Sequence, residues 1–370
     1  MRIVALAAIA LLTSASALRV SAPHGFVARS GDRLVLNGHT FRFTGVNAFQ
    51  LATDYALNTG CGPQPTSPDA VFKDLPPHAV VRFWAFQSMA VNPATHALDW
   101  AALDRVVAAA KADDVKLAMV LSDQAGTCDD DHWHDAAWYR GGFRRIYDDG
   151  GRHADVVSYA TWVHTIVPRY AHSTAVAYWE PVNEPQVSSC PAGTSPVRCI
   201  DHSSCEPNGA ATLRSFFDVI GREIHRMDRW HPVASGTIGD DQCGTGAGIG
   251  RSDRDWLTVA KSPGLDVLTV HDYATGRSLL QDERAASAAH DVGKPVVYEE
   301  VGLPAGLGTL GCPSPLARTS QLVAKESAVL RQPGIVGFLP WQWLAERPAG
   351  CSLAITPGDP LLRQLAARLG

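Results

Sequence analysis

The chain has 370 residues, a formal net charge of -5, and 46% hydrophobic and 19% charged residues. It contains no basic run longer than a pair, which argues against nucleic acid as a partner. The length and composition exclude a small module and allow either two domains or one large architecture such as a barrel.

The first residues have the layout of a secretory signal peptide. A basic start at Arg2 precedes an apolar stretch over Ile3–Leu12 and a small-residue segment in which Ala15–Ala17 fits an A-x-A cleavage site. We therefore expect a signal peptide over 1–17, a mature domain over 18–370 and a secreted, extracellular protein. An uncleaved anchor is the alternative, although the apolar stretch is short for a bilayer; beyond it we expect no membrane contact.

Short apolar, β-rich runs recur along the mature chain. Because these runs are continuous rather than alternating, they indicate strands buried on both faces, as in a parallel sheet. We predict about eight strands, over Phe41–Asn47, Ala79–Ala85, Val115–Leu121, Ala175–Val182, His231–Gly236, Leu265–Val270, Pro295–Glu300 and Ile335–Trp341.

Helix-like segments separate most of these strands. Residues 99–114, 209–228 and 319–332 carry apolar side chains at helical spacing, and a last helix is expected at 360–370. About eight strands that each lead to a helix predict a single α/β domain, a (β/α)8 TIM barrel. An open doubly wound sheet is the alternative, but it normally has a glycine-rich phosphate loop after its first strand, and Gly45–Thr53 is not one.

Several segments after the predicted strands are long, and all 8 cysteines lie in or near such segments. No two cysteines form a C-x-x-C pair, so in an exported chain disulfides are expected rather than a zinc site. We predict the bridges Cys190–Cys199 and Cys312–Cys351, as hypotheses, since eight cysteines allow about 105 pairings. In a barrel these bridges would stiffen the rim of a binding site.

Polar residues stand where the predicted strands end, which is where a barrel carries its functional side chains. Any one of them can be a capping or salt-bridge residue, but glycoside hydrolysis needs such a set. It requires one carboxylic acid to protonate the leaving oxygen, one carboxylate to attack the anomeric carbon, an arginine beside it and an aromatic floor for the sugar. The strand-end residues are Asn47, Arg82, Asn183, Glu184, His271, Tyr273, Glu299, Glu300 and Trp341.

Five segments carry a family resemblance: "VRFWAF", "WEPVNEP", "HDY", "PVVYEEVG" and "FLPWQW". Together they resemble the signatures of glycoside hydrolase family 5 and its clan A relatives, particularly the endo-β-mannanase and cellulase-like members. They follow the family's order and span roughly Gly45 to Trp343. The resemblance implies a (β/α)8 catalytic domain and a retaining double displacement that uses no metal or cofactor.

The resemblance also implies roles for individual residues. Glu184 matches the general acid/base, and Asn183 matches the asparagine that hydrogen-bonds the sugar 2-hydroxyl. Two glutamates compete for the role of nucleophile, and neighbouring strand residues point to opposite sides, so only one is expected to face the barrel axis. The family pattern of Glu, apolar residue and Gly selects Glu300; Glu299 is the alternative.

The remaining residues that match the family pattern are expected to surround the two catalytic carboxylates. Arg82 matches the second-strand arginine near the nucleophile, while His271 and Tyr273 match an H-x-Y pair whose tyrosine hydrogen-bonds it. Trp341 matches the tryptophan under the reacting sugar, and Trp343 is expected to pack or to form an outer wall. Glu180 is expected to form a structural ion pair below the site rather than to catalyse.

The sequence departs from the family pattern after the third strand, in the segment Ser122–Asp135. Its aromatic neighbours could stack on sugars or pack in the core (Trp133, Trp138 and Tyr139), and its acidic cluster is expected to be a solvated loop rather than a metal site (Asp129, Asp130, Asp131, His132 and His134). A cysteine-bearing insertion at Ser188–Cys205 is expected to wall off one end of the cleft, which would suit action on chain ends.

These observations predict a secreted, monomeric, retaining glycoside hydrolase that binds a polysaccharide or oligosaccharide, with β-mannan or β-glucan as the leading substrate. A furanosidase acting on galactan or arabinogalactan is the alternative. A carbohydrate-binding protein on an inactive scaffold is disfavoured because both carboxylates and Arg82 are present. Esterase chemistry is a weaker rival, since the chain lacks a G-x-S-x-G elbow.

Overall fold

The structure is a computed structural model that describes residues 22–63, 67–148, 150–239, 243, 254–274, 279–308 and 310–369. The predicted signal peptide over 1–17 lies outside these residues. Among the described helices, none combines the length and apolarity that a bilayer crossing requires.

A curled sheet of seven parallel strands forms the centre of the molecule, in the order β10-β11-β12-β4-β5-β6-β7. Every residue of these strands is buried, as the continuous apolar runs predict. The strands are β4 (Phe43–Asn47), β5 (Val80–Trp84), β6 (Lys116–Val120), β7 (Val176–Glu180), β10 (Leu268–Asp272), β11 (Val296–Val301) and β12 (Ile335–Pro340).

The predicted strand at 231–236 joins the two edges of this sheet. Val233 forms a parallel bridge with Trp179 of β7, and Ala234 forms one with Val267, directly before β10. The segment therefore occupies the fifth place in the barrel, although only single bridges hold it there. The α/β barrel prediction is confirmed.

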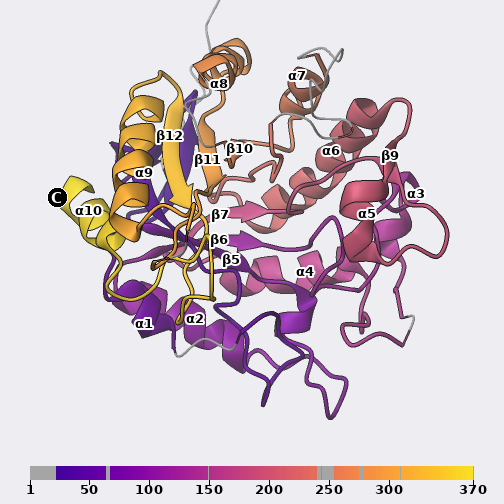
Figure 1. Cartoon of the computed structure of the whole chain (residues 1–370). Helices are drawn as coiled ribbons and strands as arrows, with labels where there is room; N and C mark the ends of the chain where they lie inside the picture. Colours follow the sequence, from indigo (N-terminus) through magenta and orange to yellow (C-terminus); the bar gives the residue numbers. More distant parts are fainter. Residues whose placement is uncertain are drawn as a thin grey trace, which may run out of the picture.

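Helices surround the sheet; Figure 1 shows α9 beside β12, and α10 next to α9 at the C-terminus. Capping side chains set several helix starts: Ser158 accepts a hydrogen bond from Thr161 N, and Ser314 accepts one from Ala317 N. The helices are α1 (Pro68–Phe72), α2 (Ala101–Ala112), α3 (Ala136–Tyr139), α4 (Tyr159–Tyr170), α5 (Pro196–His202), α6 (Gly209–Met227), α7 (Arg254–Ala260), α8 (Leu279–Val292), α9 (Pro315–Val329) and α10 (Pro360–Leu369), with 3₁₀ turns η1 (Gln87–Met89) and η2 (Gly142–Arg144).

A small antiparallel sheet that we did not predict precedes the barrel; it consists of β1 (Val27–Ser30), β2 (Arg33–Leu36) and β3 (His39–Phe41). Its apolar side chains pack against residues at the starts of the barrel strands, in a cluster that includes Val80 of β5 and Val297 of β11. The sheet thereby closes the amino-terminal end of the barrel. The carboxyl-terminal end of the strands is left for the site.

Four disulfides brace the loops at that end, and both predicted pairs are among them: Cys61–Cys128, Cys190–Cys199, Cys205–Cys243 and Cys312–Cys351. The insertion after β7 contains a short ribbon of β8 (Ser188–Ser189) and β9 (Ser204–Cys205) around α5. Its Cys199 packs against Trp133 of the loop after β6. Two loops that are far apart in sequence therefore form one rim.

Candidate active site

The carboxyl ends of the barrel strands surround a cavity of about 760 Å³. Arg82 and His271 are buried directly beneath it, in hydrogen-bond contact with residues of its wall. The structure thus brings all the predicted site residues together. Wall residues used below are Asp123, Asn183, Glu184, Tyr273, Glu300 and Trp341.

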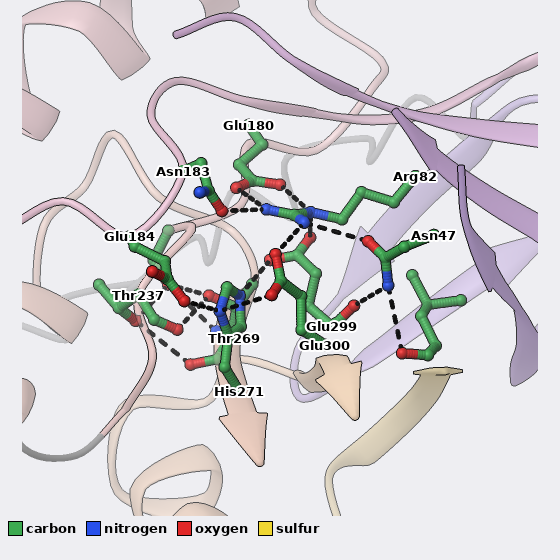
Figure 2. A network of polar contacts seen from close by, with 12 residues as sticks. Asn47, Arg82, Glu180, Asn183, Glu184, Thr237, Thr269, His271, Glu299 and Glu300 are labelled. Carbon is green, nitrogen blue, oxygen red and sulfur yellow. Dashed lines mark hydrogen bonds and ion pairs between the residues drawn. The ribbon is translucent and has the colours of Figure 1, made fainter. Parts of the chain in front are cut away.

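The Arg82 guanidinium organises the polar floor of the site, as Figure 2 shows. Its Nε and Nη2 atoms donate to the two oxygens of Glu180 at 2.8 and 2.7 Å, and both side chains are fully buried. Nη1 donates to Glu300 Oε1 at 2.5 Å, and Nη2 also donates to Asn183 Oδ1 at 2.7 Å. Glu180 forms the expected structural ion pair below the site.

Glu299 and Glu300 both reach Arg82, so the expectation that only one of them faces the barrel axis is wrong. The β10–β11 register runs from Val270↔Tyr298 directly to His271↔Glu300, skipping Glu299. This β-bulge breaks the two-residue alternation of the strand. Glu299 Oε1 lies 3.5 Å from Arg82 Nε and its side chain is fully buried. Glu300, by contrast, lines the cavity, as expected for the nucleophile.

Glu184 occupies an unusual backbone conformation at the mouth of the barrel, with φ at +50°. Its N–H donates to Gly236 O at 2.8 Å, which ties it to the fifth strand segment. Gly236 has φ of +65°, and a Cβ there would lie 1.9 Å from Val182 O. Only glycine fits at that position. This backbone hydrogen bond, at a position where only glycine fits, holds Glu184 at the cavity wall.

His271 links the two candidate catalytic carboxylates. Its Nδ1 atom lies 2.7 Å from Glu184 Oε1 and 3.5 Å from Glu300 Oε2. Carboxylate oxygens of Glu184 and Glu300 and a ring nitrogen of His271 all lie within 4.8 Å of one another. Burial alone would lower the His271 pKa, but Glu300, Glu184 and Glu299 outweigh it and raise that pKa to about 10.

The pKa values of the carboxyl groups in the site differ because each group has different neighbours. Burial and the charge of Glu299 raise the pKa of Glu180, whereas the Arg82 guanidinium, which donates to both of its oxygens, opposes this and favours the ionised form. Burial also disfavours the charge of Glu184, yet the hydrogen bond and charge of His271 prevail and lower the Glu184 pKa. The opposite directions of the two shifts, down for the Glu184 pKa and up for the His271 pKa, have their common cause in the 2.7 Å contact between these groups.

An aromatic wall completes the cavity. Trp341 stacks on Phe49, with ring centroids 5.8 Å apart, and Trp84 lies 5.9 Å from Trp341. The Tyr273 hydroxyl donates to Glu300 Oε2 at 2.5 Å, as the H-x-Y match implies. Trp343 is fully buried and packs in the core, one of the two expected placements.

Only some of the aromatic residues in the loop after β6 line the cavity. Trp138 and Tyr139 are core residues, whereas Trp133 reaches the cavity and donates to Ser188 O at 3.1 Å. The neighbouring insertion contributes Ile200 to the cavity wall, in line with the expectation that it closes one side.

The acidic segment of this loop is not the solvated loop that we expected. Asp129, Asp130 and His134 are buried, with potential ligand atoms within 4.8 Å of one another. Asp129 Oδ2 accepts from Ser122 Oγ at 2.6 Å, and His134 Nε2 lies 2.9 Å from Asp130 Oδ2. Hydrogen bonding inside the loop therefore accounts for these side chains, which act as a polar scaffold.

Asp123 is a wall residue that our sequence interpretation missed. It follows β6 directly, and its Oδ1 accepts from Asn183 Nδ2 at 2.9 Å. The rule that selected the other candidates, a polar residue at the end of a predicted strand, applies to it equally. The segment Ser122–Asp135 departs from the family pattern, so the resemblance offers no match for this residue.

Replacing Arg82 with methionine is expected to lower the free energy of unfolding by about 3–5 kcal/mol, because it leaves buried carboxylates without their cation. Urea unfolding followed by circular dichroism measures this loss. Arg318→Met is the matched control, because Arg318 is equally buried but does not line the cavity. It forms an ion pair with Asp359, with a nitrogen–oxygen distance of 2.5 Å. The variant should lose stability but keep its activity per folded molecule. Equal stability of Arg82→Met and wild type would contradict the role of Arg82.

No family model matches the chain, but individual proteins are similar to it. A protein named probable mannan endo-1,4-β-mannosidase C, from Aspergillus terreus, is 28% identical over 337 residues, which cover 80% of this chain and 77% of that protein. Mannan endo-1,4-β-mannosidase A of Hypocrea jecorina is 24% identical over 379 residues, covering 90% and 74%.

Solved structures show the same fold. An endo-1,4-β-mannanase from Rhizomucor miehei has a TM-score of 0.63 and 22% identity, covering 92% of this chain and 98% of that one. A family 5 glycoside hydrolase from the same organism, a mannosidase, has a TM-score of 0.59 and 13% identity, covering 93% and 96%. The chain is therefore similar to these proteins over most of its length.

Proposed function

Because this chain is a glycoside hydrolase of family 5 and clan A, related to the endo-β-mannanases, we propose that it cleaves β-1,4-mannosidic bonds in a mannan-type polysaccharide with retention of anomeric configuration. The observation that carries the stereochemical part is the spacing of the two carboxylates. One carboxylate oxygen of Glu184 lies within 4.8 Å of one carboxylate oxygen of Glu300; this is a bound on their nearest approach, and it supports the shorter of the two spacings found in glycosidases. Retaining enzymes have their carboxyl groups about 5–5.5 Å apart, whereas inverting enzymes need about 6.5–9.5 Å to admit a water molecule.

In the first step Glu300 attacks the anomeric carbon while the glycosidic oxygen takes a proton from Glu184. Glu184 draws that proton from His271 across the 2.7 Å contact between them. The charge of Glu300 is the largest of the effects that raise the His271 pKa. When the ester to the sugar forms, that charge disappears and the His271 pKa falls, so proton release and bond formation assist each other.

In the second step Glu184 accepts a proton from water, which attacks the anomeric carbon and releases Glu300. Arg82 and Tyr273 each hold one oxygen of Glu300, at 2.5 Å, and stabilise the carboxylate as it leaves. Trp341 offers the reacting sugar an apolar face. The proposed roles of Glu184, Glu300, Arg82, Asn183, His271, Tyr273 and Trp341 therefore fit one double-displacement cycle.

We also propose that the protein is secreted and acts as a monomer. The four disulfides support export, because such bonds persist in oxidising compartments. The relatives' names support mannan as the substrate.

A panel of glycans tests the function. We expect reducing sugar from linear β-1,4-mannan and galactomannan, with less or none from β-1,4-glucan and from aryl galactofuranosides and arabinofuranosides. Proton NMR of the first products should show the β-anomer before mutarotation. Release from furanosides alone would overturn the substrate, an initial α-anomer would overturn retention, and binding without release would favour a carbohydrate-binding protein.

A further inference from the structure

Asp123 lies just beyond β6, where the chain still pairs with the segment that follows β7. Asp123 and Asn183 form a parallel bridge, in which Asn183 N donates to Ser122 O at 2.8 Å and Gln124 N donates to Asn183 O at 3.0 Å. Both side chains line the cavity and are at most 9% exposed. Their relative position is therefore set by backbone hydrogen bonds rather than by a mobile loop.

The amide of Asn183 lies between two groups of opposite hydrogen-bonding character. Its Oδ1 accepts from Arg82 Nη2 at 2.7 Å, and its Nδ2 donates to Asp123 Oδ1 at 2.9 Å. A guanidinium has donors only, so a flipped amide would oppose its NH₂ group to the Arg82 N–H; at Asp123 it would oppose acceptor to acceptor whenever that carboxyl is ionised. Arg82 and Asp123 together permit one orientation.

This orientation leaves one hydrogen of Nδ2 for a ligand. The Asn183 NH₂ group has two hydrogens, and within the described residues its protein acceptor is Asp123 alone. The Oδ1 atom, by contrast, is occupied by Arg82 at the floor. Asn183 therefore presents a donor to the cavity and requires an acceptor, such as a hydroxyl oxygen, from the sugar.

Asp123 is itself held in place as an acceptor. Its Oδ2 accepts from Ala125 N at 3.2 Å, and within the described part of the chain it forms no salt bridge. Burial, helped by the charge of Glu184 and opposed by the hydrogen bond from Asn183, raises its pKa to about 7. The Asn183 amide is thus one of the few groups that stabilise this carboxylate.

We propose that Asp123 is a positioning residue that fixes the Asn183 amide so that its N–H, and not its carbonyl, meets the sugar hydroxyl next to the anomeric carbon. The inference rests on the proposed function, because it assigns that hydroxyl to Asn183. Asp123 thereby makes cleavage depend on the 2-hydroxyl group of the substrate, and it acts through Asn183 rather than on the reacting atoms.

The test compares an aryl β-mannoside with its 2-deoxy analogue, using kcat/KM for each. The ratio of the two kcat/KM values measures how much contact with the 2-hydroxyl speeds the reaction. The two substrates also differ in intrinsic reactivity, but this difference is the same for every variant and cancels when their ratios are compared. Asp123→Leu should reduce the wild-type ratio about tenfold, the loss of roughly one hydrogen bond. Asp123→Asn can still offer a carbonyl oxygen to Asn183 Nδ2 and should keep the ratio within about twofold.

Two further variants make the result specific. Asn183→Ala should abolish the same dependence, and Asp123→Leu added to it should lower the ratio no further. Asp155→Asn is the matched control: Asp155 is a buried carboxylate with a raised pKa at the end of the same loop, outside the cavity wall. It should leave the ratio unchanged.

The outcomes separate this inference from the function on which it rests. A wild-type protein that cleaves no mannoside overturns the proposed function. An active wild type whose ratio is the same in Asp123→Leu overturns the role of Asp123. Should Asp123→Leu fail to fold, as judged by circular dichroism, Asp123→Ala removes the acceptor without adding bulk and decides the question by the same ratio.

Discussion

Glu300→Ala is expected to lower kcat on mannan by on the order of 10⁵-fold, because it removes the proposed nucleophile, which would form the covalent intermediate. Glu299 cannot replace it, although it is adjacent in sequence and also reaches Arg82. The Glu299 side chain is fully buried beneath the cavity, where the Tyr178 hydroxyl donates to it at 2.9 Å. The measurement is turnover of an aryl β-mannoside with a good leaving group, which makes a weak residual rate visible.

Covalent trapping identifies the nucleophile independently of any substitution. A 2-deoxy-2-fluoro mannosyl inactivator should label the wild-type protein once, and peptide mapping should place the label on Glu300. Glu299→Gln is the control, since it keeps the shape of the neighbouring side chain; it should still be labelled at Glu300, whatever its loss of stability. A label found on Glu299 would reverse the assignment.

Glu184→Ala is expected to lower kcat on mannan by about 10³–10⁴-fold, at the upper end of what general acid catalysis contributes. The loss should depend on the leaving group, because a dinitrophenyl mannoside needs no proton to depart. With that substrate the variant should form the intermediate readily and release it slowly. Added azide should then attack the intermediate and restore turnover, giving a β-mannosyl azide.

Glu180→Gln is the matched control for this experiment, because it alters the other glutamate of the same stretch of chain. Glu180 lies four positions earlier and is bound on both oxygens by Arg82. Its substitution should change stability but give no dependence on the leaving group and no rescue by azide. Azide rescue of Glu180→Gln, or its absence in Glu184→Ala, would contradict the assignment of the acid/base.

Much of the architecture follows from local patterns in the sequence. Strands buried on both faces must be apolar throughout, so each of the eight predicted segments was recognisable without its partners. The Cys190–Cys199 pair spans a short loop and was likewise expected. The motif around Glu184 pointed to the site because a polar residue at the end of a buried strand lies at the mouth of a barrel.

The arrangement inside the site depends on contacts that no local pattern contains. The β-bulge that turns both Glu299 and Glu300 toward Arg82 arises from the pairing of β11 with its neighbours. Strict alternation would have placed them on opposite faces. The acidic segment around Asp129 illustrates the same limit, since its composition suggests exposure while the fold buries it and supplies its hydrogen bonds.

Local patterns in the sequence therefore predict the barrel, the end of the barrel where polar residues gather, and the residue types available there. The folded structure adds that Arg82 binds Glu180 and Glu300 at once, that His271 contacts both Glu184 and Glu300, and that the Asn183 amide donates to Asp123. Apolar character and its periodicity along the chain are properties of a single segment. Hydrogen-bond partners and charge states instead depend on side chains that several strands bring to one point.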